Sequence, residues 1–302
     1  MSAPRPRLIL ARDAGTIVEL DGRRPSDVPT LHRVRRGAYV DEAAWRDAGE
    51  RQRYELLVRG TIPALRRAPV LAHESAAVLL RIPVIGPWPD VVHVIGKPSA
   101  GGRSSAKVVH HGVREQPGLA MVGDVVVTSP ARTAVDLART RSFASGLAAA
   151  DHVLRTGLAT REDLEAELAK TRGRRGHQRA RLVVRHADGR AESVGESLSR
   201  AQMIELGLPT PVLQQEFYDD EGLIGRTDFW WPELRTIGEF DGFVKFGRAL
   251  VGDDADARLA LWEEKRREDR LRRQGNGVVR WTWDEAFRRD GFARLLAAAG
   301  IR

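Results

Sequence analysis

The sequence predicts a mixed α/β (α+β) protein with more than one folded region. Short β-branched segments alternate with capped helical segments over residues 1–170. From residue 191 onward the pattern predicts a helix, three strands, a helix, a strand and a helix. A chain of 302 residues is long enough for one to three domains. We therefore expect four segments, namely 1–60, 61–170, a basic linker over 171–190, and 191–302.

The composition excludes several classes of protein. The chain has 42% apolar and 30% charged residues and no cysteine. A disulfide scaffold, a Cys-ligated zinc site and a thiol nucleophile are therefore excluded. The N-terminal segment holds only a short apolar run, and no apolar stretch approaches the length of a membrane span. We expect a cytoplasmic protein with no membrane partner and no evident small-molecule cofactor.

The net charge of +8 is unevenly distributed along the chain. Residues 191–302 have 17 basic and 21 acidic side chains, a net of −4, whereas residues 1–190 have 32 and 20, a net of +12. Such an excess indicates a polyanionic partner, for which DNA is the leading candidate. An arginine-rich composition without any such partner would give the same charge, so both interpretations stay open.

Residues 1–60 contain a candidate wing. Leu31–Val40 alternates basic residues with apolar or small ones, which is typical of a hairpin whose Arg33, Arg35 and Arg36 face phosphate. A solvated edge hairpin explains the same pattern. Residues 42–60 are expected to form one helix with an apolar face.

Residues 61–170 are expected to form a small α/β unit followed by helices. Ser129 is a suitable N-cap for a helix that begins at Pro130. Thr160 caps a later helix, which together with its predecessor resembles either a helix-turn-helix or a plain helical hairpin. The remaining elements predicted here are a helix over 70–80, strands over 91–95, 107–111 and 123–128, and a helix over 143–156.

The histidines and glycines of this region suggest no further site. His110 and His111 are adjacent on a predicted strand, so they point to opposite faces and cannot chelate one ion together. Gly101-Gly102 lacks the spacing and the lysine of a nucleotide-binding loop.

Residues 225–242 contain the candidate catalytic site. They read as two strands around a Pro-Glu-Leu turn, in a register that pairs Asp228 with Glu239 and Arg226 with Asp241. Two opposed carboxylates repel unless a divalent cation lies between them, and a cation held by carboxylates can activate water against a phosphodiester. Asp241 could instead form an ordinary ion pair with Arg226. The register is also inferred, and a shift of one residue in the pairing of the strands would move a side chain to the opposite face of the sheet.

The order of motifs over 191–302 resembles the restriction-endonuclease-like (PD-(D/E)XK) superfamily, and within it the very-short-patch-repair-type domains. The resemblance is carried by Asp228, Glu239-Phe-Asp241, the helix Glu264–Asp269 and the strand Val278–Trp281. It implies a restriction-endonuclease-like αβββαβ domain over 191–302. It also implies that an active enzyme would bind Mg²⁺, or Mn²⁺, through Asp228 and Glu239.

The same resemblance implies roles for further residues. Glu196 matches a helix acid that often joins such sites, although Ser193-Val-Gly-Glu196 also reads as a capping box. In the superfamily a lysine two residues after the second acid positions the attacking water, but this sequence has Asp241 at that position. Lys245, four residues further on, is the candidate to supply the ammonium group instead. On the charged helix before Arg273, Lys265 or Arg267 would face the phosphate.

The first two thirds of the chain is similar to the AbiEi-type antitoxin family of type IV toxin–antitoxin systems. The matching stretches are Leu31–Val40, His73–Leu80 and Val127–Leu137. The resemblance implies an N-terminal winged helix and a cognate toxin as partner. No clear pair of helices precedes Leu31, so residues 1–60 are expected to be a degenerate, winged-helix-like segment that contacts the DNA backbone rather than the bases.

These observations lead to three functional hypotheses. The first is a nucleic-acid-binding protein with a Mg²⁺-dependent DNA endonuclease domain. The second is a non-catalytic antitoxin or transcriptional repressor whose C-terminal domain is a pseudo-nuclease. The third is a protein-interaction scaffold without a nucleic-acid role. Binding to phosphates weakens steeply as salt rises, which distinguishes the third hypothesis from the other two.

Overall fold

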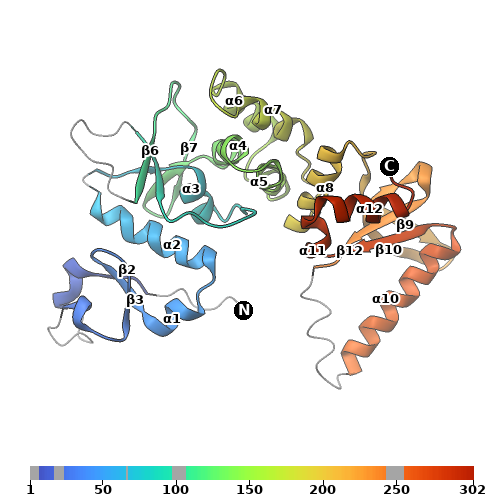
Figure 1. Cartoon of the computed structure of the whole chain (residues 1–302), viewed down its shortest axis with the longest axis horizontal. Coiled ribbons are helices and arrows are strands. Elements are labelled where there is room, and N and C mark those ends of the chain that lie inside the picture. Colours follow the sequence, from blue (N-terminus) through green and yellow to red (C-terminus); the bar gives the residue numbers. More distant parts are fainter. Residues whose placement is uncertain (1–6, 17–23, 66, 97–106, 243–254) are drawn as a thin grey trace. The chain divides into compact units, whose positions relative to one another are not determined.

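The computed structural model describes residues 7–16, 24–65, 67–96, 107–242 and 255–302 (Figure 1). These residues form helices and three sheets, which confirms the mixed α/β class. The chain divides into two compact units. Unit 1 comprises Met1–Ala149 and Leu158–Arg185, and unit 2 comprises Ala150–Gly157 and His186–Arg302. No helix within the ranges given is long and apolar enough to cross a membrane.

Unit 1 begins with a three-stranded antiparallel sheet and two helices. The strand order is β1–β3–β2, and the hairpin β2–β3 turns at Gly37, whose φ of +82° favours glycine. The predicted hairpin is therefore confirmed. The elements are β1 Ile9–Leu10, β2 Leu31–Arg35, β3 Ala38–Asp41, α1 Glu42–Asp47 and α2 Glu50–Thr61, with 3-10 turns at Ala11–Thr16, Pro25–Asp27 and Ile62–Ala64.

A five-stranded mixed sheet forms the centre of unit 1. Its strand order is β6–β5–β4–β8–β7, with β5–β6 and β4–β8 parallel and the other pairs antiparallel. The register places Leu71, Val94 and Val127 on one face, where they are buried in a core cluster that includes side chains of α2 and α3. The strands are β4 Val70–Leu71, β5 Val92–Ile95, β6 Val108–His111, β7 Leu119–Val122 and β8 Val125–Thr128.

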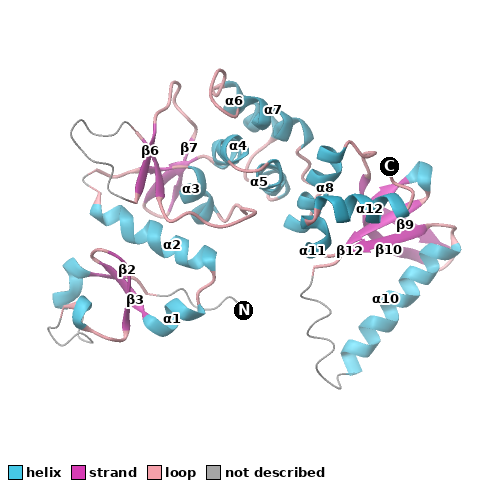
Figure 2. Cartoon of the chain, viewed as in Figure 1, coloured by secondary structure: helices cyan, strands magenta, loops and turns pink. Residues whose placement is uncertain are grey.

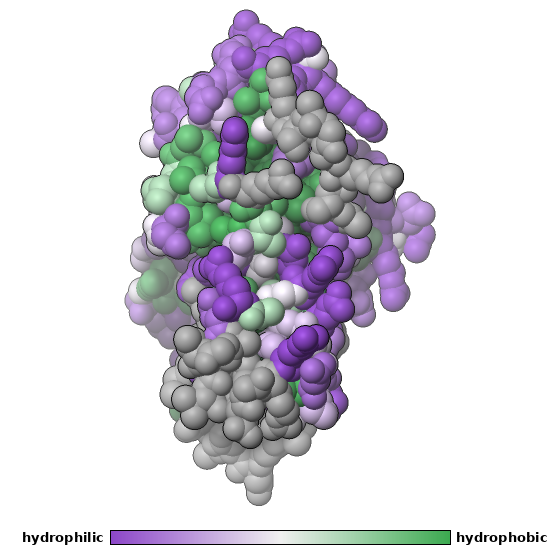
Figure 3. Space-filling model, turned by 90° about the vertical axis from the view of Figure 1, so that its left-hand side faces the viewer, coloured by the Kyte–Doolittle hydropathy of each residue, from purple (hydrophilic) through white to green (hydrophobic). Residues whose placement is uncertain are grey.

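Some apolar side chains of this sheet remain at the surface. Figure 3 shows apolar side chains gathered at the level of the five-stranded sheet. Val109 on β6 and Leu119 and Met121 on the edge strand β7 are exposed. Burial in this sheet is therefore least complete toward its two edge strands.

The remaining helices of unit 1 follow from strong local signals. Ser129 caps α4 and accepts a hydrogen bond from the Arg132 N–H, with Pro130 in the first turn as predicted. Thr160 and Asp163 form the predicted capping box of α6. The helices are α3 His73–Leu80, α4 Pro130–Thr140, α5 Phe143–Arg155, α6 Arg161–Ala169 and α7 His177–His186; the division between the units falls within α5.

Unit 2 has a four-stranded sheet with helices on both faces (Figure 2). The strand order is β12–β11–β10–β9, and β12 is parallel to β11. Phe229 and Trp281 pack with Phe292 of α12, whereas Ile237 on the other face packs with Leu271 of α10. The elements are α8 Val194–Leu206, β9 Val212–Asp219, β10 Gly222–Trp231, a 3-10 turn Pro232–Leu234, β11 Thr236–Phe240, α10 Ala255–Arg273, β12 Gly277–Trp281, α11 Trp283–Phe287 and α12 Arg289–Ala298.

Unit 2 follows the predicted order of elements up to β12, but the single final helix that the sequence predicts is two helices, α11 and α12, separated at Arg288. Unit 1 differs from the prediction in three places. The helix predicted over 42–60 is two helices, because the chain is extended at Ala48-Gly49 before α2 begins. The helix predicted over 70–80 starts at His73, since Val70-Leu71 pairs with β5 as a strand. Strand β7 is absent from the prediction, although it forms a hairpin with β8 around Gly123.

Candidate functional site

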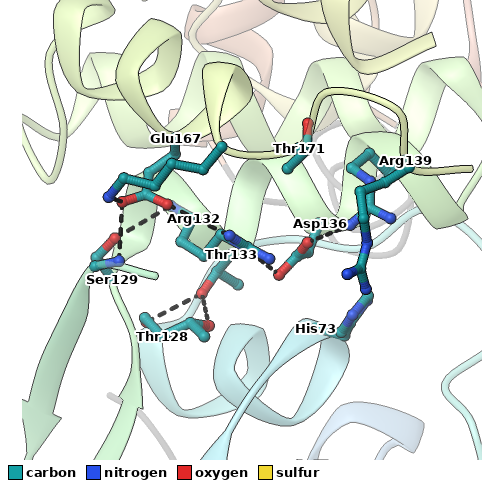
Figure 4. Close-up of polar contacts among 12 residues, drawn as sticks. His73, Thr128, Ser129, Arg132, Thr133, Asp136, Arg139, Glu167 and Thr171 are labelled. Atoms are coloured by element: carbon teal, nitrogen blue, oxygen red, sulfur yellow. Dashed lines mark hydrogen bonds and ion pairs between the residues drawn. The ribbon is translucent and has the colours of Figure 1, made fainter. Parts of the chain in front are cut away.

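A buried network of charges surrounds α4 in unit 1 (Figure 4). Asp136 is fully buried and accepts a hydrogen bond from Arg132 Nε at 2.7 Å and another from Arg139 Nη1 at 2.8 Å. Burial alone would raise the pKa of Asp136, but the charges of Arg132 and Arg139 and the hydrogen bond from Arg132 lower it. The carboxylate is therefore held ionised between two cations.

This network also connects α4 to the segments that follow it. Arg132 Nη1 lies 3.6 Å from Glu167 on α6, and Glu167 accepts hydrogen bonds from the Gly118 N–H and Lys170. Arg139 donates to the carbonyl of Arg175. A Cβ added at Gly176 would lie 2.1 Å from the Arg139 carbonyl oxygen, so this close approach requires glycine. The network thus fixes α6 and the start of α7 on α4.

Three histidines form a second cluster in unit 1, in which His73 is buried and His93 and His111 are half-buried. His73, His93 and His111 come from α3, β5 and β6, with His93 Nδ1 2.8 Å from His111 Nε2 and the His73 ring stacked on His111 at 3.9 Å. Burial lowers the pKa of His73 to about 3 and those of His93 and His111 to about 4. The rings are therefore neutral at physiological pH. Their stacked arrangement fits aromatic packing in the interior.

In unit 2 the predicted hairpin register is confirmed. β10 and β11 pair Phe229 with Gly238 and Trp230 with Ile237. One residue further, this register places Asp228 opposite Glu239. Glu196 of α8 lies close enough that its charge, with that of Glu239, acts on Asp228. The three predicted acids are thus brought together.

Glu239 is neutralised by two arginines that come from other elements. Arg267 of α10 lies 2.5 Å from Glu239 Oε1, and Arg280 of β12 lies 2.9 Å from Oε2. Arg267 also binds Glu264, as does Arg280. Arg267, predicted to face a phosphate, is therefore engaged by carboxylates, whereas Lys265 is exposed on α10.

Asp228 and Glu196 are held by hydrogen bonds from uncharged groups. Asp228 accepts from the Phe240 N–H at 2.9 Å, and Glu196 accepts from the Glu192 N–H and the Gln214 side chain. Gln214 has a φ of +56° in the middle of β9, a strained conformation for a residue with a side chain. Burial, followed by the charge of Glu196 and then that of Glu239, raises the pKa of Asp228 to about 7.

These acids do not fit a divalent cation as they are arranged. Both oxygens of Glu239 contact arginines, and Asp228 has one oxygen bound to the backbone. In the part of the chain that the structure describes, no group of three or more His, Asp or Glu side chains is arranged to hold a metal ion. A cation would first have to displace Arg267 or Arg280 from Glu239.

Asp241, which stands where the endonuclease superfamily has a lysine, does not have the partner that the sequence suggested. Asp241 is half-buried, and burial raises its pKa although Arg280 is near. Arg226 pairs with Glu192 at 2.6 Å, so the alternative in which it pairs with Asp241 is wrong. Lys245, the candidate for a migrated ammonium group, lies outside the described residues.

The three arginines of the predicted wing have different environments. Arg33 and Arg36 are exposed on the β2–β3 hairpin. Arg35 is half-buried, and its Nη1 donates to the carbonyls of Gly60 and Thr61 at the end of α2. Arg35 therefore has a structural role, which leaves Arg33 and Arg36 able to reach a ligand.

Sequence reasoning missed three features of these sites, namely the Asp136 network, the histidine cluster and Gln214. Arg132 and Asp136 have the i,i+4 spacing that indicates an ion pair on a helix, but nothing local indicates that the pair is buried. The histidines lie far apart in the sequence, and His93 meets His111 only because β5 pairs with β6. The conformation of Gln214 has no signal in the sequence.

We expect the stability of unit 2 to fall as the pH rises from about 4 to 7. A carboxyl whose folded pKa is raised to about 7 contributes stability below its unfolded pKa of about 4, and this contribution is lost as the pH rises through 7. Asp228→Asn should therefore be more stable than the unsubstituted chain at pH 8 and nearly equal to it at pH 4. Urea unfolding followed by tryptophan fluorescence measures this, because five of the seven tryptophans are in unit 2.

The exposed Asp220 of the same unit provides the matched control. Asp220→Asn should leave the pH dependence unchanged. A pH profile of Asp228→Asn that is parallel to that of the unsubstituted chain would contradict the assignment.

Comparison with known proteins identifies a family likeness in the middle of the chain. Residues 89–185 match the AbiEi antitoxin C-terminal domain, which covers β5 to α7 and includes the Asp136 network. This supports the AbiEi-type part of the resemblance drawn from the sequence.

Two uncharacterized proteins of Mycobacterium tuberculosis, MT2308 and Rv2248, are each 42% identical over 123 residues. The matched stretch covers 41% of this chain and 45% of each relative, which is less than half of their length. The crystal structure of the RV2827C protein from the same organism aligns with 72% of this chain and 85% of its own, at 16% identity and a TM-score of 0.36. Of these likenesses, the match over 89–185 bears most directly on function.

Proposed function

We propose that this chain is a non-catalytic antitoxin of a toxin–antitoxin system that also binds DNA. The observation that carries the proposal is the match of residues 89–185 to the AbiEi antitoxin C-terminal domain. The matched segment contains the whole Asp136 network, so the charges that fix its helices lie within it. The cognate partner would be a toxin encoded near this chain.

Growth rescue tests the antitoxin role. Genes adjacent to that of this chain would be expressed from an inducible promoter, with and without the full chain. We expect one of them to arrest growth and the full chain to relieve the arrest. Asp228→Asn and Glu239→Gln should relieve it equally well, because the proposal gives the acid cluster no catalytic part. The antitoxin role is lost if no adjacent gene causes an arrest that this chain relieves.

DNA binding is the second part of the proposal. Residues 1–190 have a net charge of +12, and Arg33 and Arg36 are exposed on a hairpin that projects basic side chains. Exposed arginines on a hairpin suit contacts to phosphate, which position a protein without reading the sequence. Binding of this kind fits a repressor whose specificity comes from other contacts.

Salt titration tests the DNA contacts. Replacing both Arg33 and Arg36 with alanine should weaken duplex DNA binding and reduce the slope of log affinity against log salt by about 2, since each phosphate contact contributes about 0.9. Arg190→Ala is the matched control, because this exposed arginine is paired with Asp188. An unchanged slope in the double variant would exclude the hairpin as the contact. Affinity that does not vary with salt at all would favour the scaffold hypothesis.

A DNA endonuclease is the second candidate function, and the assembly of Glu196, Asp228 and Glu239 favours it. Burial, followed by the charges of Glu196 and Glu239, raises the pKa of Asp228, and shifts of this kind cluster at functional sites. The arginines bound to Glu239 oppose this function, since they hold the oxygens that a cation would need. For this reason we place the non-catalytic function first.

A cleavage assay separates these two functions. The full chain, Asp228→Asn and Glu239→Gln would be incubated with supercoiled and linear DNA in the presence of Mg²⁺ or Mn²⁺. We expect no nicking above background with any of the three proteins. Metal-dependent cleavage that both substitutions abolish would establish the nuclease and make Lys245 the next residue to test.

A further inference from the structure

Unit 1 has a cleft of about 470 Å³ that shares only Arg33 with the proposed DNA contact. Its walls come from β2, α1, α2, the segment 87–90 that precedes β5, and Lys107, the residue before β6. Two of the chain's seven tryptophans, Trp45 and Trp88, line it. A cleft of this volume suits a small planar ligand.

The aromatic side chains of the cleft are held in place by their neighbours. Trp88 is half-buried and stacks on the buried Tyr54, with ring centroids 5.2 Å apart. The Tyr54 hydroxyl is itself fixed by Ser75 and by the Val91 carbonyl. Trp45 stacks with His32 at 4.2 Å, and the Arg53 guanidinium lies 5.2 Å from its ring centroid. The cleft therefore has preformed aromatic walls.

The charges at the cleft select among flat ligands. Arg33 and Lys107 are exposed on its lining, and neither forms an ion pair with another residue that the structure describes. Two exposed carboxylates, Glu50 and Asp90, also line it, so a bare inorganic anion would be repelled at one side. A nucleotide matches both signs, because its phosphate pairs with cations while the amino groups of its base donate to carboxylates.

We propose that this cleft binds an unpaired nucleobase, stacked against Trp88, with its phosphate held by Arg33 and Lys107. This inference rests on the proposed DNA contact of the β2–β3 hairpin, since Arg33 belongs to both surfaces. Stacking on an aromatic side chain is tolerant of sequence, because every base has a π-face. The ligand is a single-stranded segment, an extruded base of a duplex, or a free nucleotide.

Fluorescence anisotropy with labelled oligonucleotides tests the proposal on the full chain. The probes are a single strand, a blunt duplex and the same duplex with one unpaired cytosine. We expect the unpaired cytosine to increase affinity about tenfold over the blunt duplex, and Trp88→Ala to remove this gain. Trp88→Phe keeps an aromatic ring on which a base can stack, so it should retain most of the gain in affinity for the unpaired cytosine. Lys107→Glu, at an exposed position, should also weaken binding to the unpaired probe.

Controls separate this inference from the DNA contact on which it rests. Trp262→Ala, at an exposed tryptophan of unit 2, should change nothing. If Trp88→Ala binds the blunt duplex normally but loses the gain, both proposals are supported. Equal affinity for the blunt duplex and for the duplex with an unpaired cytosine would refute the proposed nucleobase site in the cleft. The proposed DNA contact of the β2–β3 hairpin would still stand.

Competition identifies the part of the ligand that the cleft recognises. dCMP should displace the unpaired probe, whereas inorganic phosphate at the same concentration should not. Equal displacement by the two would overturn the proposal, because the site would then recognise charge alone. Displacement by dCMP together with no duplex binding would retain the cleft as a nucleotide site and refute the hairpin contact.

Discussion

The buried carboxylate of Asp136 is the constraint on which the organisation of unit 1 depends. A carboxylate with no exposed surface is tolerated only when it is paired and hydrogen-bonded, and removal of one partner from such a pair typically costs about 3–5 kcal/mol. Both partners, Arg132 and Arg139, extend the network beyond α4. Arg132 reaches Glu167 on α6, and Arg139 reaches the backbone before α7. Charged contacts, in addition to apolar packing, therefore hold these helices on α4.

Unit 2 repeats the same arrangement with different residues. Glu239 lies between Arg267 and Arg280, and the fully buried Asp151 binds Arg200 at 2.6 Å. Among the described arginines, Arg132, Arg139 and Arg200 are buried in this way, and Arg267 and Arg280 are half-buried. Because each such pair holds one positive and one negative charge, it leaves the net charge of +8 unchanged, and the net charge does not say which arginines can reach a polyanion. Arg33, Arg36 and Lys107 are among the exposed cations that can reach a ligand.

The sequence predicts best those features that depend on neighbouring residues. The N-caps Ser129 and Thr160, and the hairpin register that sets Asp228 opposite Glu239, follow from local patterns and are confirmed. The partners of Glu239 could not be predicted, because Arg267 and Arg280 are distant in the sequence and reach it only through the placement of α10 and β12. The hairpin pattern groups Arg35 with its exposed neighbours, since nothing in that pattern reveals the end of α2 beside it.

The cleft and the hairpin of unit 1 suggest how this protein could bind some nucleic acids in preference to others without recognising their base sequence. Exposed arginines bind any backbone, so Arg33 and Arg36 alone would not distinguish one DNA from another. In the proposed complex, Trp88 would add a contact that a base can make only after it leaves the stack. Unstacking costs least where a base is already unpaired, so this contact favours strand ends, bulges and single strands over intact duplex. Arg33 lies on the hairpin and also lines the cleft, so one phosphate contact can position the base that follows it. The protein would then select nucleic acids by whether their bases are unpaired rather than by their sequence.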